Sequence, residues 1–214
     1  MKYPDAYSGI KKLFTAEILN IVVAVLGIIA GGTLIATVKN AADIESGTAA
    51  VLGAGALGLI AGIVALVSFI LQLVGLSQAG KDEKNFKNAL LAALAGIVIS
   101  ILSSAFSKNA FLTGLFSMLG TVCNLLITLM VINGIISLAK KLGNEEIERK
   151  GNNILKILVL VYVITAVVEL LSGIFGKNAV SSITGVLSIV AGIFAVLAAI
   201  FYISLLSKAA KMLE

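Results

Sequence analysis

Long apolar stretches separated by short clusters of charged residues make up most of this chain. Six stretches run between these clusters, with Glu17 in the first and Glu169 in the fifth as their only charges: 13–38, 46–80, 88–107, 109–139, 157–176 and 178–207. A helix crosses a bilayer with about 20 predominantly apolar residues, whereas barrel strands alternate apolar and polar positions over about ten. The pattern therefore predicts an all-α integral membrane protein with six transmembrane helices in one domain, residues 1–214.

Charge adds an orientation to this prediction. Only 13% of the residues are charged, against roughly a quarter in a soluble domain, and 59% are hydrophobic. Of the 16 basic residues, three follow odd-numbered stretches, and the other 13 lie on the opposite side. Because basic loops stay in the cytoplasm, both termini are predicted to lie there, in a plasma membrane or bacterial-type inner membrane. Membrane topology explains the net charge of +5, so the expected partner is the lipid bilayer and no nucleic acid.

The tripeptide Lys-Asn-Ala recurs at 39–41, 108–110 and 177–179, each time in the turn after an odd-numbered stretch. Equal spacing at equivalent positions is the sequence signature of an internal repeat. We therefore predict three tandem helical hairpins around a pseudo-threefold axis, over approximately 13–80, 86–142 and 153–211. Residues 1–12, with their tyrosines and lysines, are predicted to form an interfacial N-terminal segment.

Aligning the three hairpins brings small residues onto one another. Helices in lipid associate through small residues that let their backbones approach, so these positions are predicted to be helix-packing faces. In the even-numbered helices the aligned pairs are Gly58 and Gly62, Ser117 and Thr121, and Ser188 and Gly192. In the odd-numbered helices they are Gly27 and Gly31, Gly96 and Ser100, and Thr165 and Glu169.

Glu169 therefore replaces a small residue on a face that meets other helices. Ionisable side chains inside a membrane usually face the bundle interior. Thr165 and Ser172 lie on the same helix within hydrogen-bonding reach, and Ser100 and Asn124 are expected partners from neighbouring helices. We predict a ligand-binding site at these five residues, with Glu169 as a proton-responsive or cation-coordinating group. The alternative is a neutral carboxyl that holds helices together.

The other acidic residue within these stretches is Glu17, one turn beyond Lys12. Its position near the cytoplasmic interface favours a solvated or paired carboxyl, with Asn20 extending the polar patch. Gln72 is interpreted as an amide that bonds across helices, and Cys123 as a small packing residue.

Enzyme chemistry finds no support in the sequence. The chain has no histidine, which excludes His-based metal sites and Ser-His or Cys-His nucleophiles. The segment GAGALG at 53–58 fits a dinucleotide-binding spacing, but no strand precedes it. We expect no enzyme activity, no cofactor and no metal.

Two classes of function remain. The first is a small-solute or ion transporter, channel-like protein or substrate-binding membrane subunit with a cavity near Glu169. The alternative is a non-transporting accessory or scaffold subunit that packs against another membrane protein or against itself as a homo-oligomer. A solvent-reachable cavity favours the first class, and helices sealed against one another favour the second.

Overall fold

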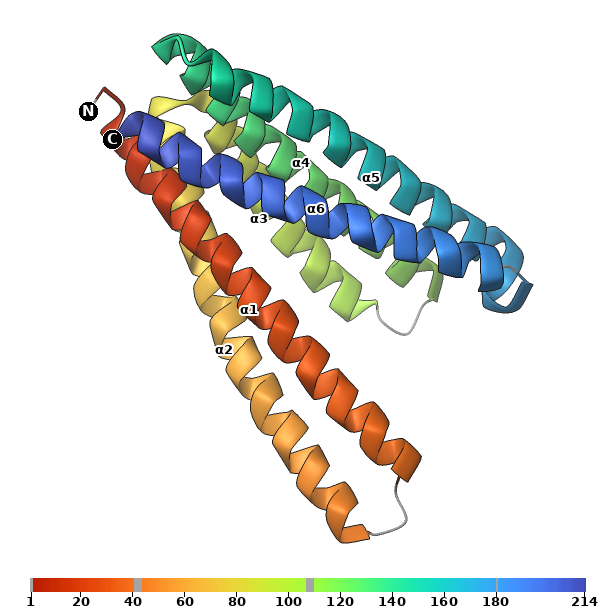
Figure 1. Cartoon of the computed structure of the whole chain (residues 1–214). Helices are drawn as coiled ribbons and strands as arrows, with labels where there is room; N and C mark the ends of the chain where they lie inside the picture. Colours follow the sequence, from red (N-terminus) through yellow and green to blue (C-terminus); the bar gives the residue numbers. More distant parts are fainter. Residues whose placement is uncertain (1, 41–43, 107–109, 180) are drawn as a thin grey trace.

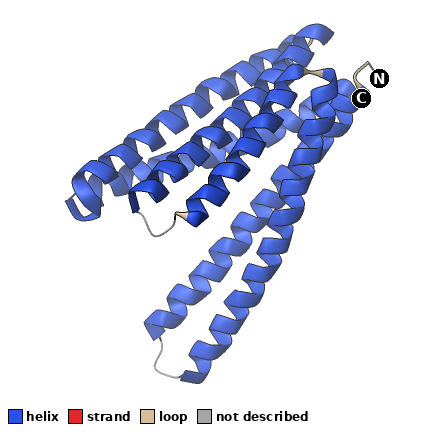
Figure 2. Ribbon diagram, turned by 180° about the vertical axis from the view of Figure 1, so that it is seen from behind, coloured by secondary structure: helices blue, strands red, loops and turns tan. Residues whose placement is uncertain are grey.

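Six helices follow one another along the chain in the computed structural model (Figure 1): α1 (Pro4–Asn40), α2 (Ile44–Asp82), α3 (Lys84–Ala105), α4 (Ala110–Leu142), α5 (Glu145–Ala179) and α6 (Ser181–Leu213). The structure describes residues 2–40, 44–106, 110–179 and 181–214, without the side chains of 31–52, 54, 110–111, 113–114, 117 and 163–195. The described residues contain no strand (Figure 2), so the all-α, six-helix prediction is confirmed.

Five helical stretches in the described part of the chain are long and apolar enough to cross a membrane: Pro4–Ala30, Gly55–Asp82, Lys84–Ala105, Met118–Leu142 and Val196–Leu213. The chain is therefore a polytopic membrane protein. Several helices are longer than the hydrocarbon layer. The 37 residues of α1, for example, span about 55 Å, against about 30 Å of hydrocarbon. Helix α1 begins at Pro4, so most of the predicted interfacial segment forms its first turns.

Both termini lie at one end of the molecule, together with the α2–α3 and α4–α5 turns; we call this the terminal end (Figure 1). Each helix contacts its neighbours in sequence, and α6 also contacts α1. Away from the terminal end, the α1–α2 hairpin diverges from the other four helices, as both views show (Figures 1 and 2). The threefold repeat stays a prediction.

The well-packed core lies close to the terminal end. Side chains with no exposed surface come from five helices there: Ala6, Ile10, Leu76, Ala79, Phe86, Ala89, Ile132, Ile135, Leu138, Ala139, Leu206 and Ala209. Farther along the helices, large apolar side chains such as Ile28, Leu59 and Ile101 are exposed. Water drives apolar side chains together, whereas lipid solvates them as well as another helix does. Buried apolar side chains at the terminal end and exposed ones farther along the helices are what we expect if the terminal end lies near water and the rest of the helices face lipid.

Helices α1 and α2 approach most closely at Gly9 and Gly75, within the terminal end. A Cβ atom on Gly9 would lie 2.5 Å from the Gly75 carbonyl oxygen and 2.6 Å from the Ala79 amide nitrogen. A Cβ atom on Gly75 would lie 2.8 Å from the Gly9 carbonyl oxygen. Only residues without a side chain allow two helix backbones to touch in this way.

The glycines selected by the repeat alignment are placed differently. Among the described residues, no atom lies within 4 Å of a Cβ built on Gly27, Gly58 or Gly62, and a Cβ on Gly96 would meet only the Cβ of Cys123, at 3.7 Å. Thr121 is half-buried. Four further positions lie outside the described side chains: Gly31, Ser117, Ser188 and Gly192. Close helix packing at Gly27, Gly58 and Gly62 stays a prediction.

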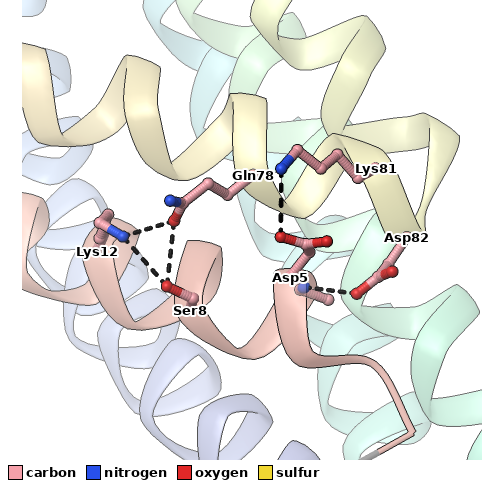
Figure 3. A network of polar contacts seen from close by, with 7 residues as sticks. Asp5, Ser8, Lys12, Gln78, Lys81 and Asp82 are labelled. Atoms are coloured by element: carbon pink, nitrogen blue, oxygen red, sulfur yellow. Dashed lines mark hydrogen bonds and ion pairs between the residues drawn. The ribbon is translucent and has the colours of Figure 1, made fainter.

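Polar contacts between α1 and α2 reinforce the terminal end (Figure 3). The Asp82 carboxylate accepts a hydrogen bond of 2.7 Å from the Ala6 amide, and Asp5 pairs with Lys81 at 3.4 Å. The first amides of a helix have no partner within that helix, and its N-terminus attracts negative charge. Asp82, at the last residue of α2, therefore caps the first turn of α1.

One turn farther along α1, a second group of contacts continues the same seam (Figure 3). Lys12 donates to the side-chain oxygens of Gln78 and Ser8, and the Ser8 hydroxyl donates to Gln78 at 3.1 Å. The ammonium group of Lys12 is thus held against α2.

Glu83 joins the α2–α3 turn to α4. Its carboxylate is 7% exposed and accepts hydrogen bonds from Ser137 at 2.9 Å, from Lys141 and from Asn85 at 3.0 Å. Burial by itself would raise the pKa of Glu83, but the hydrogen bonds from Lys141 and Ser137, with the positive charge of Lys141, lower it below its ordinary value of 4.5.

We expect Glu83→Gln to lower the free energy of unfolding by about 2 kcal/mol at pH 7, because it removes charged hydrogen bonds from a buried group. A lowered folded-state pKa stabilises the protein above the ordinary pKa of 4.5, and this contribution is lost as the pH falls through the folded-state value. Unfolding in mixed micelles between pH 7 and pH 3 should therefore show the difference between variant and wild type shrinking. Glu148→Gln, which breaks the more exposed pair with Lys140, is the control and should change stability by less than about 1 kcal/mol.

Candidate functional site

A pocket of about 460 Å³ lies between α2, α3 and α4, within three membrane-spanning stretches. This volume is in the range of small-molecule sites. Residues from all three helices line it: Phe69, Gln72, Ala93, Gly96, Ile97, Ser100, Ile101, Ser104, Gly120, Asn124 and Ile127. No charged residue is among them.

Helical spacing explains why these residues share the pocket. Gly96, Ser100 and Ser104 succeed one another at intervals of four residues on α3, as do Gly120 and Asn124 on α4. Residues four apart lie one above the other on the same face of a helix. The glycines leave space beside the backbone, and the hydroxyl and amide groups of the next turns face into it.

The polar groups of the pocket are uncharged, and some of them have no hydrogen-bond partner among the described residues. The Ser104 hydroxyl donates to the Ser100 carbonyl oxygen at 3.0 Å. Within the described part of the chain, the side-chain amides of Gln72 and Asn124 have no hydrogen-bond partner. An amide in an apolar medium needs a partner, since leaving it unpaired costs several kcal/mol. The two amides therefore offer donors and acceptors to water or to a bound molecule.

Sequence reasoning placed two of these residues, Ser100 and Asn124, in a ligand-binding site, and the structure brings both into this pocket. The side chains of Glu169, Thr165 and Ser172 lie outside the described part of the chain. Sequence reasoning missed the pocket role of Gln72. An amide in the middle of an uncharged stretch was the available signal for Gln72.

Glu17 marks a second polar region, where α1 faces α2 and α6. Its half-buried side chain is hydrogen-bonded to Asn20, three residues on, and lies within electrostatic range of the phenols of Tyr162 and Tyr202. No cation pairs with it among the described residues. The sequence favoured a solvated or paired carboxyl here. It gave no sign that Ser68 of α2 contacts Ala16 and Asn20 beside this carboxyl.

On the surface of the terminal end, α5 and α6 are joined by ion pairs. Glu146 lies 2.6 Å from Lys150 and 3.1 Å from Lys208. Hydrogen bonds from these two lysines lower the pKa of Glu146 to about 2. The pairs are exposed to solvent, so they orient the two helices more than they stabilise them.

Comparisons with protein-family models, curated proteins and solved structures find no match for this chain.

Proposed function

We propose that the protein binds a small, polar, uncharged solute in the pocket between α2, α3 and α4 and carries it through the membrane, without enzymatic chemistry. The observation that supports this proposal is the pair of unpartnered amides, Gln72 and Asn124, in an intramembrane pocket of about 460 Å³. Both termini are taken to lie in the cytoplasm, because most basic residues are at the terminal end.

The lining of the pocket favours a neutral solute over an ion. Selective ion pathways use rings of carbonyl oxygens or charged side chains. This pocket instead combines two amides and two serines with apolar walls from Phe69, Ile97, Ile101 and Ile127. Such a lining matches a molecule with several hydrogen-bonding groups and no net charge.

A thermal-shift screen of small polar solutes on purified protein, followed by uptake into proteoliposomes, tests the proposal. We expect Asn124→Leu to weaken the response about tenfold, since the loss of hydrogen bonds to the solute removes about 1.4 kcal/mol of binding. Asn133→Leu is the matched control: Asn133 is exposed on the same helix but lies outside the pocket, and its replacement should leave the response unchanged. An unchanged response in Asn124→Leu and Gln72→Leu would contradict the proposal.

A second candidate function is assembly with another membrane protein or a second copy of the chain. It is favoured by Gly27, Gly58 and Gly62, beside which the described residues leave open space, and by the exposed Leu59 and Ile63, each next to one of the last two glycines. Small residues four apart let a partner helix approach closely in lipid. A change of oligomeric state in Gly62→Leu, together with pocket variants that bind and transport as wild type does, would favour this second function.

A further inference from the structure

We propose that Glu17 is a proton-binding site, built where α1 faces α2 and α6. This site is separate from the solute pocket and does not depend on the function proposed for it. Glu17 is not among the residues that line the pocket. The pocket is lined by α2, α3 and α4, whereas Glu17 belongs to α1 and the phenols near it belong to α5 and α6.

Glu17 lies inside the membrane-spanning stretch Pro4–Ala30, about 7 Å along the helix beyond Lys12. In the described membrane-spanning stretches, the other acidic residues are Asp5 and Asp82, each within two residues of a helix end. An ionisable residue inside the membrane is disfavoured unless it has a partner or a role, and such residues commonly belong to proton pathways.

A hydrogen-bonded chain orients Asn20 toward this carboxyl. The Ser68 hydroxyl, with 1% of its residue exposed, lies 2.7 Å from Oδ1 of Asn20 and 2.8 Å from the Ala16 carbonyl oxygen. With its oxygen facing Ser68, the Asn20 amide is left with its NH₂ group to donate to Glu17, three residues earlier on the same helix. Ser68 therefore holds the Asn20 amide in place on this side of α1.

Among the side chains that the structure describes, no positive charge faces Glu17 from the surrounding helices. On α6 the facing titratable group is Tyr202, which is 8% exposed, and on α5 it is Tyr162; α2 contributes Ser68. On α1 itself, the Lys12 ammonium is bonded to Gln78 and Ser8. With no cation at hand, a proton is the simplest means of neutralising the carboxylate.

The same geometry argues against a metal ion as the ligand. A hard cation needs several oxygen ligands turned toward it. Here the oxygens of Asn20 and Ser68 face each other, and the group that Asn20 turns toward Glu17 is a nitrogen with its hydrogens. The site is thus suited to a proton, which binds to one carboxylate oxygen and gives a neutral acid.

Labelling with a hydrophobic carbodiimide tests the proposal, because this reagent reacts with protonated carboxyl groups. In proteoliposomes at pH 7 we expect mass spectrometry to find dicyclohexylcarbodiimide attached at Glu17. Above its midpoint the labelling should fall about tenfold per pH unit, as the protonated fraction does. Glu145, which is exposed at the terminal end, should remain unlabelled and serves as the control.

If the carbodiimide cannot reach the site, infrared spectroscopy determines whether Glu17 is protonated at pH 7. A protonated carboxyl has a carbonyl band distinct from that of a carboxylate, and we expect Glu17→Gln to remove a component of this band at pH 7 that Glu169→Gln leaves in place. Glu17→Asp keeps the acid, and should shift the band without abolishing it. Ser68→Ala, which releases the Asn20 amide, should move the midpoint of the titration. A carbonyl band that is unchanged in Glu17→Gln would overturn the assignment.

Discussion

Gly9→Ala should lower the free energy of unfolding by about 3 kcal/mol, although it adds only one methyl group. The new methyl group would lie 2.5 Å from the Gly75 carbonyl oxygen and 2.6 Å from the Ala79 nitrogen, both backbone atoms of α2. A flexible side chain could turn aside, but a helix backbone cannot. The substitution must therefore push α1 and α2 apart where their polar contacts and the apolar core meet.

Equilibrium unfolding in mixed micelles measures this loss. Gly27→Ala and Gly58→Ala are matched controls, because the same methyl group would meet no described atom within 4 Å there. Alanine favours a helix over glycine by up to about 1 kcal/mol, so the controls should be neutral or slightly stabilising. Equal effects at Gly9 and Gly27 would show that the contact between α1 and α2 is not as close as described.

Phe86→Ala should also lower the free energy of unfolding, by about 3 kcal/mol. Phe86 has no exposed surface, and its ring lies against Gly134 of α4, where a Cβ atom would come within 2.7 Å of the ring. Removing the ring leaves a cavity between α3 and α4 that the well-packed neighbours cannot fill.

A second substitution at Gly134 separates cavity formation from general disruption. In the wild type, Gly134→Ala should be destabilising, because its methyl group would overlap the buried ring of Phe86. In Phe86→Ala the same methyl group enters the cavity and should be neutral or stabilising. The effect of Gly134→Ala on stability should therefore change sign. Thermal unfolding in detergent of the wild type, the two single variants and the double variant measures this coupling directly. Additive losses would contradict the contact.

The helices were predictable because charge marks their ends. Lys81, Asp82 and Glu83 at one turn and Lys140 and Lys141 at another stand where α2 and α4 finish. Apolar length between such clusters is enough to predict six helices, since a membrane places the same demand on each of them.

Helix packing was harder to predict. Small residues show where another helix can approach closely, but they do not identify which helix does so. Gly58 and Gly62 have the right spacing and no neighbour, whereas Gly9 and Gly75 form the closest contact and lie among charged residues. The main core lies toward the terminal end of the helices, where hydropathy alone does not separate residues that pack inside the protein from residues that face lipid.

The candidate site could be predicted in part. Ser100 and Asn124 were expected to bind a ligand, and they share a pocket. The contribution of Gln72 depends on how α2 packs against α3 and α4, and that of Glu17 depends on Ser68, 51 positions away in the sequence. Contacts between such distant positions leave no trace in local periodicity.

Because the α1–α2 hairpin diverges from the other helices, a tilt about the close contact at Gly9 and Gly75 would displace its far end. From Gly9 to the last residue of α1 the helix extends about 45 Å, so a tilt of about ten degrees at this contact displaces the tip by about 8 Å. Glu17 lies close to this contact, two turns beyond Gly9 on the same helix. A small rearrangement at the terminal end would therefore be amplified into a large displacement at the opposite end of the hairpin.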